Sequence, residues 1–293
     1  MTNLNTIGIV GAGIGGMATA LAAQRAGKRV MLFEQAEKIL PLGASLSIWP
    51  NAMKRLRQLG VADEVRSRGS VFQTLKIKDM SGKVLVNHDL NPLYEQAGEV
   101  GVCVSRADLH NILGSKLDPG ILHLNHKLLS FNQKASGVEL VFHGNVEQQV
   151  DFVIGADGIW STVRQLLFAD GGPAYSGYGA WLGLAKGNFE NLSDQAATEI
   201  YGRGTRLGIM ASGRGTTYWF VVGNRKAPAG RALSASREDV LAALAGWPDY
   251  AAALVNATDN NQISYVSFYD RPVARNWGIG RIALMGDAEL DEG

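Results

Sequence analysis

Two short apolar runs near the amino terminus are separated by a segment of helical composition. Residues 7–10 form the first run and residues 30–33 the second. Short continuous apolar runs are typical of parallel strands that are buried on both faces. Between them, residues 13–26 are rich in Ala, Leu, Met, Gln and Arg, contain no proline and are followed by Gly27. The pattern therefore predicts a strand, a helix and a second strand.

Glycines occupy the junction between the first strand and the helix. Residues 11–16 read Gly-Ala-Gly-Ile-Gly-Gly, so Gly11 can make a tight turn and Gly16 can let the helix pack against the strand. Gly13 lets a phosphate approach the backbone, where the amides and the positive end of the helix dipole would face a pyrophosphate. We predict a dinucleotide-binding turn that is made by Gly11, Gly13, Gly15 and Gly16.

The second strand ends at an acidic residue, Glu34. A carboxylate at this position can accept hydrogen bonds from both hydroxyls of an adenosine ribose, and it would repel a 2′-phosphate. The predicted ligand is therefore FAD or NAD rather than NADP. A flexible glycine turn is the alternative, but the strand, glycines, helix, second strand and acid all follow one another in register.

The middle of the chain changes from alternating strands and helices to adjacent strands. Apolar stretches flank an Asp-Met-Ser-Gly turn at residues 79–82 and a second turn within residues 138–150, and both patterns predict hairpins. Residues 171–270 are rich in strands, with one clear helix predicted at residues 237–245. We therefore predict an α/β fold, in which a Rossmann-like domain carries an inserted, mainly antiparallel β-sheet domain.

Two helices between these strands have recognisable starts. The first follows Pro50 and ends at Gly60, with Asn51 predicted as its cap. The second spans residues 105–117 and begins with Ser105 and Asp108 in the spacing of a capping box. Arg106 lies in its first turn, where a cation opposes the helix dipole. This position suggests an anionic partner, although a solvated surface arginine is the alternative.

Two further apolar strands end in a glycine and an aspartate. Residues 150–155 lead to Asp157 and Gly158, and a strand after Gly280 leads to Gly286 and Asp287. A carboxylate that is held at a strand end beside small residues suits a ribityl or ribose hydroxyl. Taken alone, Asp157-Gly158 also fits a simple turn.

Composition excludes several classes of function. The 293 residues include 28 basic and 27 acidic ones, which gives a formal charge of +1, with no long run of either sign. Nucleic acid and anionic membrane are therefore poor candidates as partners, and no integral membrane segment is predicted. The single cysteine, Cys103, cannot form an internal disulfide and fits a reducing cytoplasm. The five histidines lack metal-ligand spacing, so no metal is expected.

The order and spacing of these strand-end signals resemble the class A FAD-dependent aromatic monooxygenases of the p-hydroxybenzoate hydroxylase type. The resemblance implies that the glycine turn and Glu34 hold the ADP half of FAD. It implies that Asp157-Gly158 lies near the pyrophosphate, that Gly286-Asp287 holds the ribityl chain and that Arg106 contacts FAD. It also implies that NADH or NADPH reduces FAD, and that O2 adds at flavin C4a to give a hydroperoxide that hydroxylates a ring carbon.

A closer likeness is to the FAD-dependent urate hydroxylase branch. It rests on residues 41–60, on residues 175–185, and on Arg206 and Tyr218, which match the substrate arginine and tyrosine of that branch. A guanidinium can fork two hydrogen bonds onto a planar oxyanion, and a phenol can add a third. The likeness implies a small urate-like or salicylate-like substrate. An exposed Arg206 and a core Tyr218 are the alternative.

The resemblance also implies domain limits and an expectation about the carboxyl terminus. Residues 1–70, 101–170 and 275–293 are assigned to the FAD-binding domain, and residues 71–100 and 171–274 to the substrate domain. The family continues past the Gly-Asp motif, so we expect a missing carboxyl-terminal part and low hydroxylase activity. A catalytically inactive flavin-binding fragment and, less favoured, a simple NAD-dependent dehydrogenase stay open as alternatives.

Overall fold

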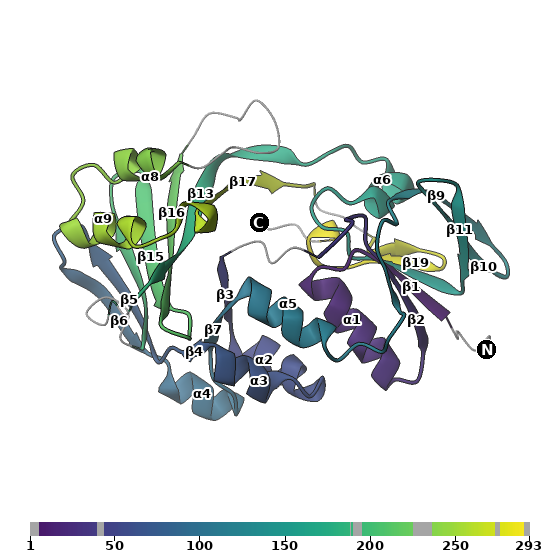
Figure 1. Cartoon of the computed structure of the whole chain (residues 1–293), viewed down its shortest axis with the longest axis horizontal. Helices are drawn as coiled ribbons and strands as arrows, with labels where there is room; N and C mark the ends of the chain where they lie inside the picture. The colour runs from purple at the N-terminus through teal and green to yellow at the C-terminus, as the bar shows by residue number, and fades with distance from the viewer. Residues whose placement is uncertain are drawn as a thin grey trace. The chain divides into compact units, whose positions relative to one another are not determined.

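A computed structural model of the protein describes residues 6–39, 44–187, 189, 195–224, 236–272 and 276–289. The chain forms two compact units, and each is assembled from segments that are distant in sequence (Figure 1). The first unit contains Met1–Leu40, His110–Ala174 and Tyr269–Gly293, and the second contains Pro41–Leu109 and Tyr175–Phe268.

The first unit is built on a mainly parallel sheet with the strand order β18-β19-β12-β1-β2-β8. Its strands are β1 (Thr6–Val10), β2 (Arg29–Phe33), β8 (Leu122–His123), β12 (Phe152–Gly155), β18 (Gly278–Ile279) and β19 (Ile282–Leu284). Strand β1 pairs in parallel with β2 and β12, and β12 pairs in parallel with β19. The predicted strands that end in glycine motifs thus lie side by side, and their carboxyl ends meet at one edge of the sheet.

Two helices and a second sheet complete the first unit. Helix α1 (Ile14–Arg25) packs against β1 and β2, and α6 (Thr162–Phe168) follows β12 (Figure 1). Strands β9 (Leu128–Lys134), β10 (Gly137–Phe142) and β11 (Val146–Val150) form an antiparallel sheet, so the hairpin predicted within residues 138–150 is confirmed. Phe33, Leu140 and Phe142 are fully buried between these layers.

The second unit is built on a larger sheet with the order β17-β13-β16-β15-β14-β5-β6. Its strands are β5 (Thr74–Asp79), β6 (Val84–Asp89), β13 (Ala174–Lys186), β14 (Ala196–Tyr201), β15 (Thr205–Ala211), β16 (Thr216–Asn224) and β17 (Ser264–Asp270). From β13 to β6 in this order, the pairings are antiparallel except for the parallel pair of β14 and β5. The predicted hairpin around residues 79–82 and the predicted antiparallel sheet are therefore confirmed.

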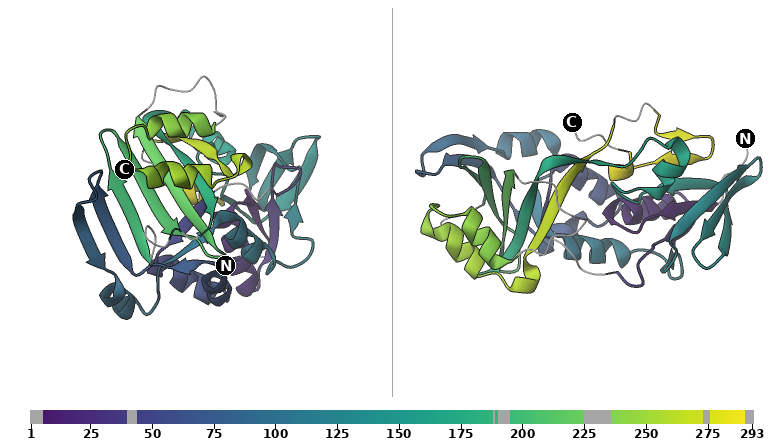
Figure 2. Two further views of the ribbon diagram at one scale, coloured as in Figure 1. Left: turned by 60° about the vertical axis from the view of Figure 1, so that its left-hand side comes forward. Right: turned by 90° about the horizontal axis from the view of Figure 1, so that it is seen from above.

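Two helices, α8 (Arg237–Ala243) and α9 (Asp249–Asn256), cover one face of this sheet (Figure 2). Their apolar side chains pack with Trp219 and Val221, which are fully buried. The prediction of a single helix in this region is wrong. Helix α9 begins directly after Pro248, which has no side chain that could cap the helix. The N-cap position therefore lacks the Ser, Thr, Asp or Asn that usually marks a helix start.

A small sheet of β3 (Ser45–Ile48), β7 (Val102–Ser105) and β4 (Ser70–Val71) also belongs to the second unit. The adjoining helices are α2 (Pro50–Gln58), α3 (Ala62–Arg68), α4 (Asn91–Ala97) and α5 (Arg106–Gly114), and two 3-10 turns, η1 (Asn260–Gln262) and η2 (Gly286–Ala288), lie later in the chain. The prediction that Asn51 caps α2 is wrong. Trp49 is the N-cap residue, because Pro50 takes the first helical position, which suits its fixed φ and missing N–H.

The compact units divide the chain at other residues than the predicted domains do. Residues 41–70 and 101–109 fall in the second unit. The physical reason is a shared core, in which Ala44 and Cys103 pack with Met210 and Tyr218 of the larger sheet. The overall α/β class, with a Rossmann-like part and an inserted antiparallel sheet, is as predicted.

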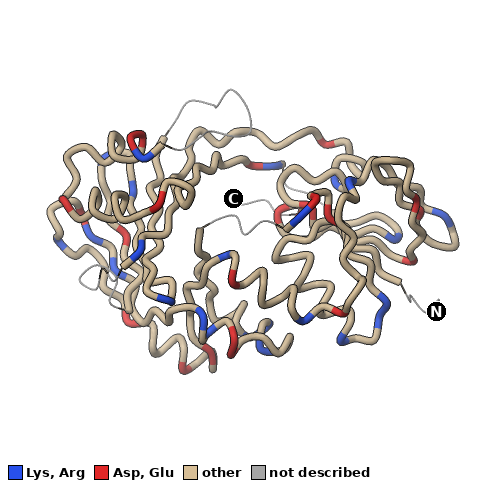
Figure 3. Tube along the Cα trace, in the orientation of Figure 1, with Lys and Arg blue, Asp and Glu red and all other residues tan. Residues whose placement is uncertain are grey.

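Charges of both signs are interspersed along the chain (Figure 3). In the part of the chain that the structure describes, no helix is both long and apolar enough to cross a lipid bilayer.

Candidate active site

The glycine turn is fixed by close backbone contacts. Gly11 has a φ of +103°, and a Cβ at this residue would lie 2.4 Å from the carbonyl oxygen of Ala156. A Cβ at Gly16 would lie 1.8 Å from the carbonyl oxygen of Gly11. Because backbone atoms cannot yield by such amounts, only glycine fits at both positions. Both glycines therefore hold β1, β12 and α1 together.

Gly13 differs from these two glycines because the fold leaves room for a side chain at this position. It is the N-cap residue of the 12-residue helix α1, with φ −70° and ψ −177° and no side-chain cap hydrogen bond. No atom lies within 4 Å of a Cβ at Gly13. The amides of the first turn of α1 thus open onto space that a Cβ would fill. A pyrophosphate fits this cradle, since it needs both close backbone approach and N–H donors.

Glu34 lies beside the same turn. Its Oε2 accepts a hydrogen bond from the N–H of Ala12 at 2.9 Å, and its Oε1 accepts one from the N–H of Ala36 at 2.9 Å. Each carboxylate oxygen has a second lone pair. The carboxylate is therefore oriented by the backbone and still able to accept ribose hydroxyls, as the predicted role requires.

The Gly286-Asp287 motif reaches the opposite side of the α1 amino terminus. Met285 Cε lies 3.4 Å from the position of a Cβ on Gly15, and Met285 Sδ accepts a hydrogen bond from the Thr19 hydroxyl at 2.9 Å. Asp287 follows in η2 and is exposed. The structure thus brings the carboxyl ends of β1, β12 and β19 together around one cradle.

Asp157 is engaged by the start of α6. Its carboxylate accepts hydrogen bonds from the hydroxyl of Ser161, and from the N–H groups of Thr162 at 2.7 Å and Val163 at 3.1 Å. Burial raises the pKa of Asp157, and these donors oppose that shift. Gly158 follows with a φ of +76°. The motif therefore builds a helix cap in this structure, and its predicted role near the pyrophosphate stays a prediction.

Arg164 forms a buried junction just behind this motif. Its guanidinium is fully buried and donates to Asp170, to the carbonyl oxygen of Pro272 at 2.6 Å and to that of Ala288 at 3.4 Å. Arg271, also buried, donates to the carbonyl oxygen of Ile159. These links hold the segment around η2 against α6.

Arg106 begins α5 in the second unit and is exposed. The N-cap role of Ser105 beside it is confirmed, because Ser105 Oγ accepts from the N–H of Asp108 at 3.0 Å. The return bond differs from that of a capping box, since the Asp108 carboxylate accepts from the Ser105 hydroxyl at 2.8 Å. The N–H of Arg106 donates to the carbonyl oxygen of Ala44 at 3.0 Å. Its predicted contact with FAD stays a prediction.

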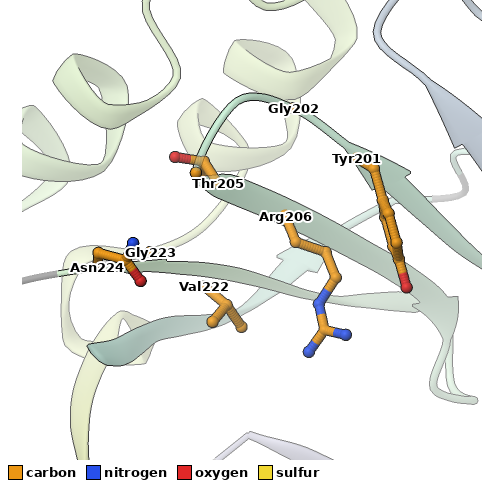
Figure 4. A pocket seen from close by; sticks show the side chains of 8 residues that line it. Tyr201, Gly202, Thr205, Arg206, Val222, Gly223 and Asn224 are labelled. Atoms are coloured by element: carbon orange, nitrogen blue, oxygen red, sulfur yellow. The ribbon is translucent and has the colours of Figure 1, made fainter. Parts of the chain in front are cut away.

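Arg206 lies on the face of the larger sheet that α8 and α9 leave uncovered. It lines a depression of about 290 Å³ together with Tyr201 and Val222. All three side chains point to one side of the sheet, whereas Thr205 points to the other (Figure 4). Arg206 Nη1 lies 3.4 Å from Glu199 Oε2, and its guanidinium carbon lies 6.0 Å from the Tyr201 ring centroid.

Tyr218 occupies the same face but not the same place. Arg206 pairs with Val222 and Met210 pairs with Tyr218, so the two residues are four positions apart in register. The ring of Phe220 comes between them, 5.8 Å from the Tyr218 ring centroid and 5.8 Å from the guanidinium carbon of Arg206. Tyr218 is only 8% exposed, and burial, with Cys103 nearby, raises its pKa. Tyr218 therefore lies in the core next to the depression rather than in its lining.

Sequence reasoning missed Glu199, Tyr201 and Phe220. Alternation along β14 and β16 indicates their shared face, but only the antiparallel register brings them beside Arg206. Among the described residues, no group of three His, Cys, Asp or Glu side chains could hold a metal ion.

Comparison with known proteins gives a consistent family. Residues 4–289 match the family described as FAD binding domain. Aurachin C monooxygenase/isomerase of Stigmatella aurantiaca is 31% identical over 284 residues, which are 97% of this chain and 73% of the relative. FAD-dependent urate hydroxylase of Klebsiella pneumoniae is 29% identical over 284 residues, which are 96% of this chain and 73% of the relative.

A solved structure agrees with both relatives. The crystal structure of Klebsiella pneumoniae HpxO complexed with FAD and uric acid has a TM-score of 0.90 to this chain at 27% identity, covering 98% of this chain and 74% of that one. The chain therefore belongs to the FAD binding domain family and is a flavoprotein monooxygenase.

Proposed function

We propose that the protein hydroxylates a small aromatic or purine-like ring with O2, with FAD as cofactor and NADH or NADPH as electron donor. The observation that carries this proposal is the open cradle at Gly13, flanked by Glu34 and Met285. FAD, when bound, accepts electrons from the nicotinamide and supplies the oxygen chemistry.

The protein's own residues bind and orient the cofactor. The first-turn amides of α1 would donate hydrogen bonds to the pyrophosphate, and Glu34 would accept hydrogen bonds from the adenosine ribose hydroxyls. The exposed carboxylate of Asp287 is suited to accept hydrogen bonds from the ribityl hydroxyls. Asp157 supports the pyrophosphate side by fixing the start of α6.

Arg206 is the proposed substrate anchor in the second unit. Its side chain is 44% exposed and lines the depression, so it can donate to an oxygen on the ring edge. Tyr218 packs against Phe220 in the core and so helps to fix the ring that lies beside Arg206. The name of the urate hydroxylase relative and the uric acid in the HpxO complex favour a purine or similar heterocycle.

The test is turnover by the FAD-reconstituted chain. NADH and NADPH consumption would be measured with uric acid and with salicylate, and hydroxylated product would be quantified by mass spectrometry. We expect a flavin absorbance spectrum and product from at least one ring. A colourless protein that oxidises NADH would support a simple dehydrogenase instead, and bound FAD without product would support an inactive flavin-binding protein.

Arg206→Gln tests the anchor. It should raise the KM for the ring about tenfold, with FAD affinity unchanged, because one charge-assisted hydrogen bond is lost. Arg203→Gln is the matched control. Arg203 is exposed in the adjoining turn, and its substitution removes the same charge. Equal effects of the two variants would contradict the assignment of Arg206.

A further inference from the structure

Glu199 lies next to the proposed substrate anchor and changes what that anchor can select. Its carboxylate is 3.4 Å from Arg206 Nη1, with side-chain exposures of 25% for Glu199 and 44% for Arg206. Arg206 is the charged residue that lines the depression, and Glu199 balances it. Glu199 lies outside the lining of the depression but forms an ion pair with Arg206, and the pair, a strong donor and a strong acceptor, carries no net charge.

The sheet register explains why these two side chains meet. Glu199 pairs with Gly208 and Tyr201 pairs with Arg206, so Glu199 and Arg206 are diagonal neighbours on one face. Gly208 has no side chain, and the Phe220 ring fills that place, since a Cβ there would lie 2.0 Å from Phe220 Cζ. The result is an apolar ring that flanks a carboxylate and a guanidinium.

A free aromatic carboxylate is a poor match for this site. It would have to displace Glu199 from Arg206 and would then lie beside a second carboxylate. A ring with a carbonyl oxygen next to an N–H has no such conflict, because it can accept from Arg206 and donate to Glu199 at the same time. An Arg-only site would show the opposite preference.

From this arrangement we infer that Glu199 is a specificity-determining residue that makes the site select lactam-bearing heterocycles, with adjacent C=O and N–H groups, over aromatic carboxylates. The inference rests on the proposed function, because it assumes that Arg206 binds substrate. It adds a second contact, from Glu199 to a ring N–H.

The experiment is calorimetric titration of the FAD-loaded full chain with uric acid and with salicylate. The wild-type protein should bind uric acid more tightly. Glu199→Gln keeps the volume of the side chain and removes its charge, so it should strengthen salicylate binding about fivefold and weaken uric acid binding by a similar factor. Glu199→Asp should keep the wild-type preference for uric acid.

Glu238→Gln is the control. Glu238 is exposed on α8, which covers the other face of the sheet, and this variant makes the same change in net charge. It should leave both affinities unchanged. If Glu199 had a merely structural role, Glu199→Gln would weaken the binding of both ligands together and leave the ratio of their affinities unchanged.

The outcomes separate the two proposals. If both ligands bind through Arg206 but Glu199→Gln leaves their affinity ratio unchanged, the inference about Glu199 is overturned while the proposed function stands. If neither ligand binds, or Arg206→Gln affects neither, the proposed substrate site itself fails, and the inference fails with it.

Discussion

Replacing Gly13 with alanine should weaken FAD binding while leaving the fold intact. The backbone angles at Gly13, φ −70° and ψ −177°, are accessible to alanine, and no protein atom lies within 4 Å of the added Cβ. Alanine is a poorer N-cap than glycine, but it also reduces the entropy of the unfolded chain. These effects oppose each other, so stability should change by no more than about 1 kcal/mol.

The expected effect on FAD is larger. The added methyl group would occupy the space through which a pyrophosphate reaches the first-turn amides of α1. Inserting a methyl group into a closely packed contact costs roughly 1–3 kcal/mol, which is about a 5- to 150-fold rise in the dissociation constant. Quenching of FAD fluorescence would measure the affinity, and thermal unfolding without FAD would measure stability.

Two further glycines serve as comparisons. Gly16→Ala should lower both stability and FAD affinity, since its Cβ would meet the Gly11 carbonyl oxygen at 1.8 Å. Gly172→Ala should change neither, because Gly172 is exposed and its Cβ meets no atom within 4 Å. Wild-type FAD affinity in Gly13→Ala would refute the idea that a phosphate approaches the backbone there.

Three other predictions follow from contacts that have been described. Glu34→Ala should weaken FAD binding by about 1–3 kcal/mol, because ribose hydroxyls lose their acceptor; an unchanged dissociation constant would remove Glu34 from the site. Gly208→Ala should displace the Phe220 ring and lower substrate affinity with FAD affinity retained, which titration of each ligand would check. His123 stacks on Phe33, and burial, with His126 nearby, holds its pKa below the usual 6.5. The unfolded chain therefore binds this proton more tightly, so stability falls as pH drops through about 6.5, and His123→Phe should reduce the fall in Tm between pH 7 and pH 5. An identical fall in the variant would contradict that role.

The geometry of the turn that is proposed to hold the cofactor was predictable from sequence because its signals are local. Gly11, Gly16 and Glu34 are read from one continuous strand, helix and strand, and the structure places them at one turn. The N-cap of α5 by Ser105 is equally local, because one hydrogen-bonded turn contains Ser105 and Asp108. Short-range patterns of this kind do not depend on the rest of the fold.

The substrate half was less predictable because it depends on pairing between strands. Sequence pointed to Arg206 and Tyr218 as partners, but the register separates them by Phe220 and puts Glu199 beside Arg206 instead. A shift of one residue would send each of these side chains to the other face. The helix α9 was missed for another reason, since its start has no capping side chain.

The buried guanidinium of Arg164 has a consequence for how the protein is made. Its partners include carbonyl oxygens of Pro272 and Ala288, which a ribosome produces long after α6. Asp170 neutralises the Arg164 charge early, but a buried guanidinium also needs acceptors for its remaining N–H groups. We therefore expect the first unit to settle only when those carbonyl oxygens emerge, on the order of ten seconds later at typical synthesis rates. Both segments of the second unit are complete before that moment. Biosynthesis should thus yield a folded second unit first, and FAD should be loaded only after residues 272–288 have been synthesised, when the nascent chain first offers the finished cradle.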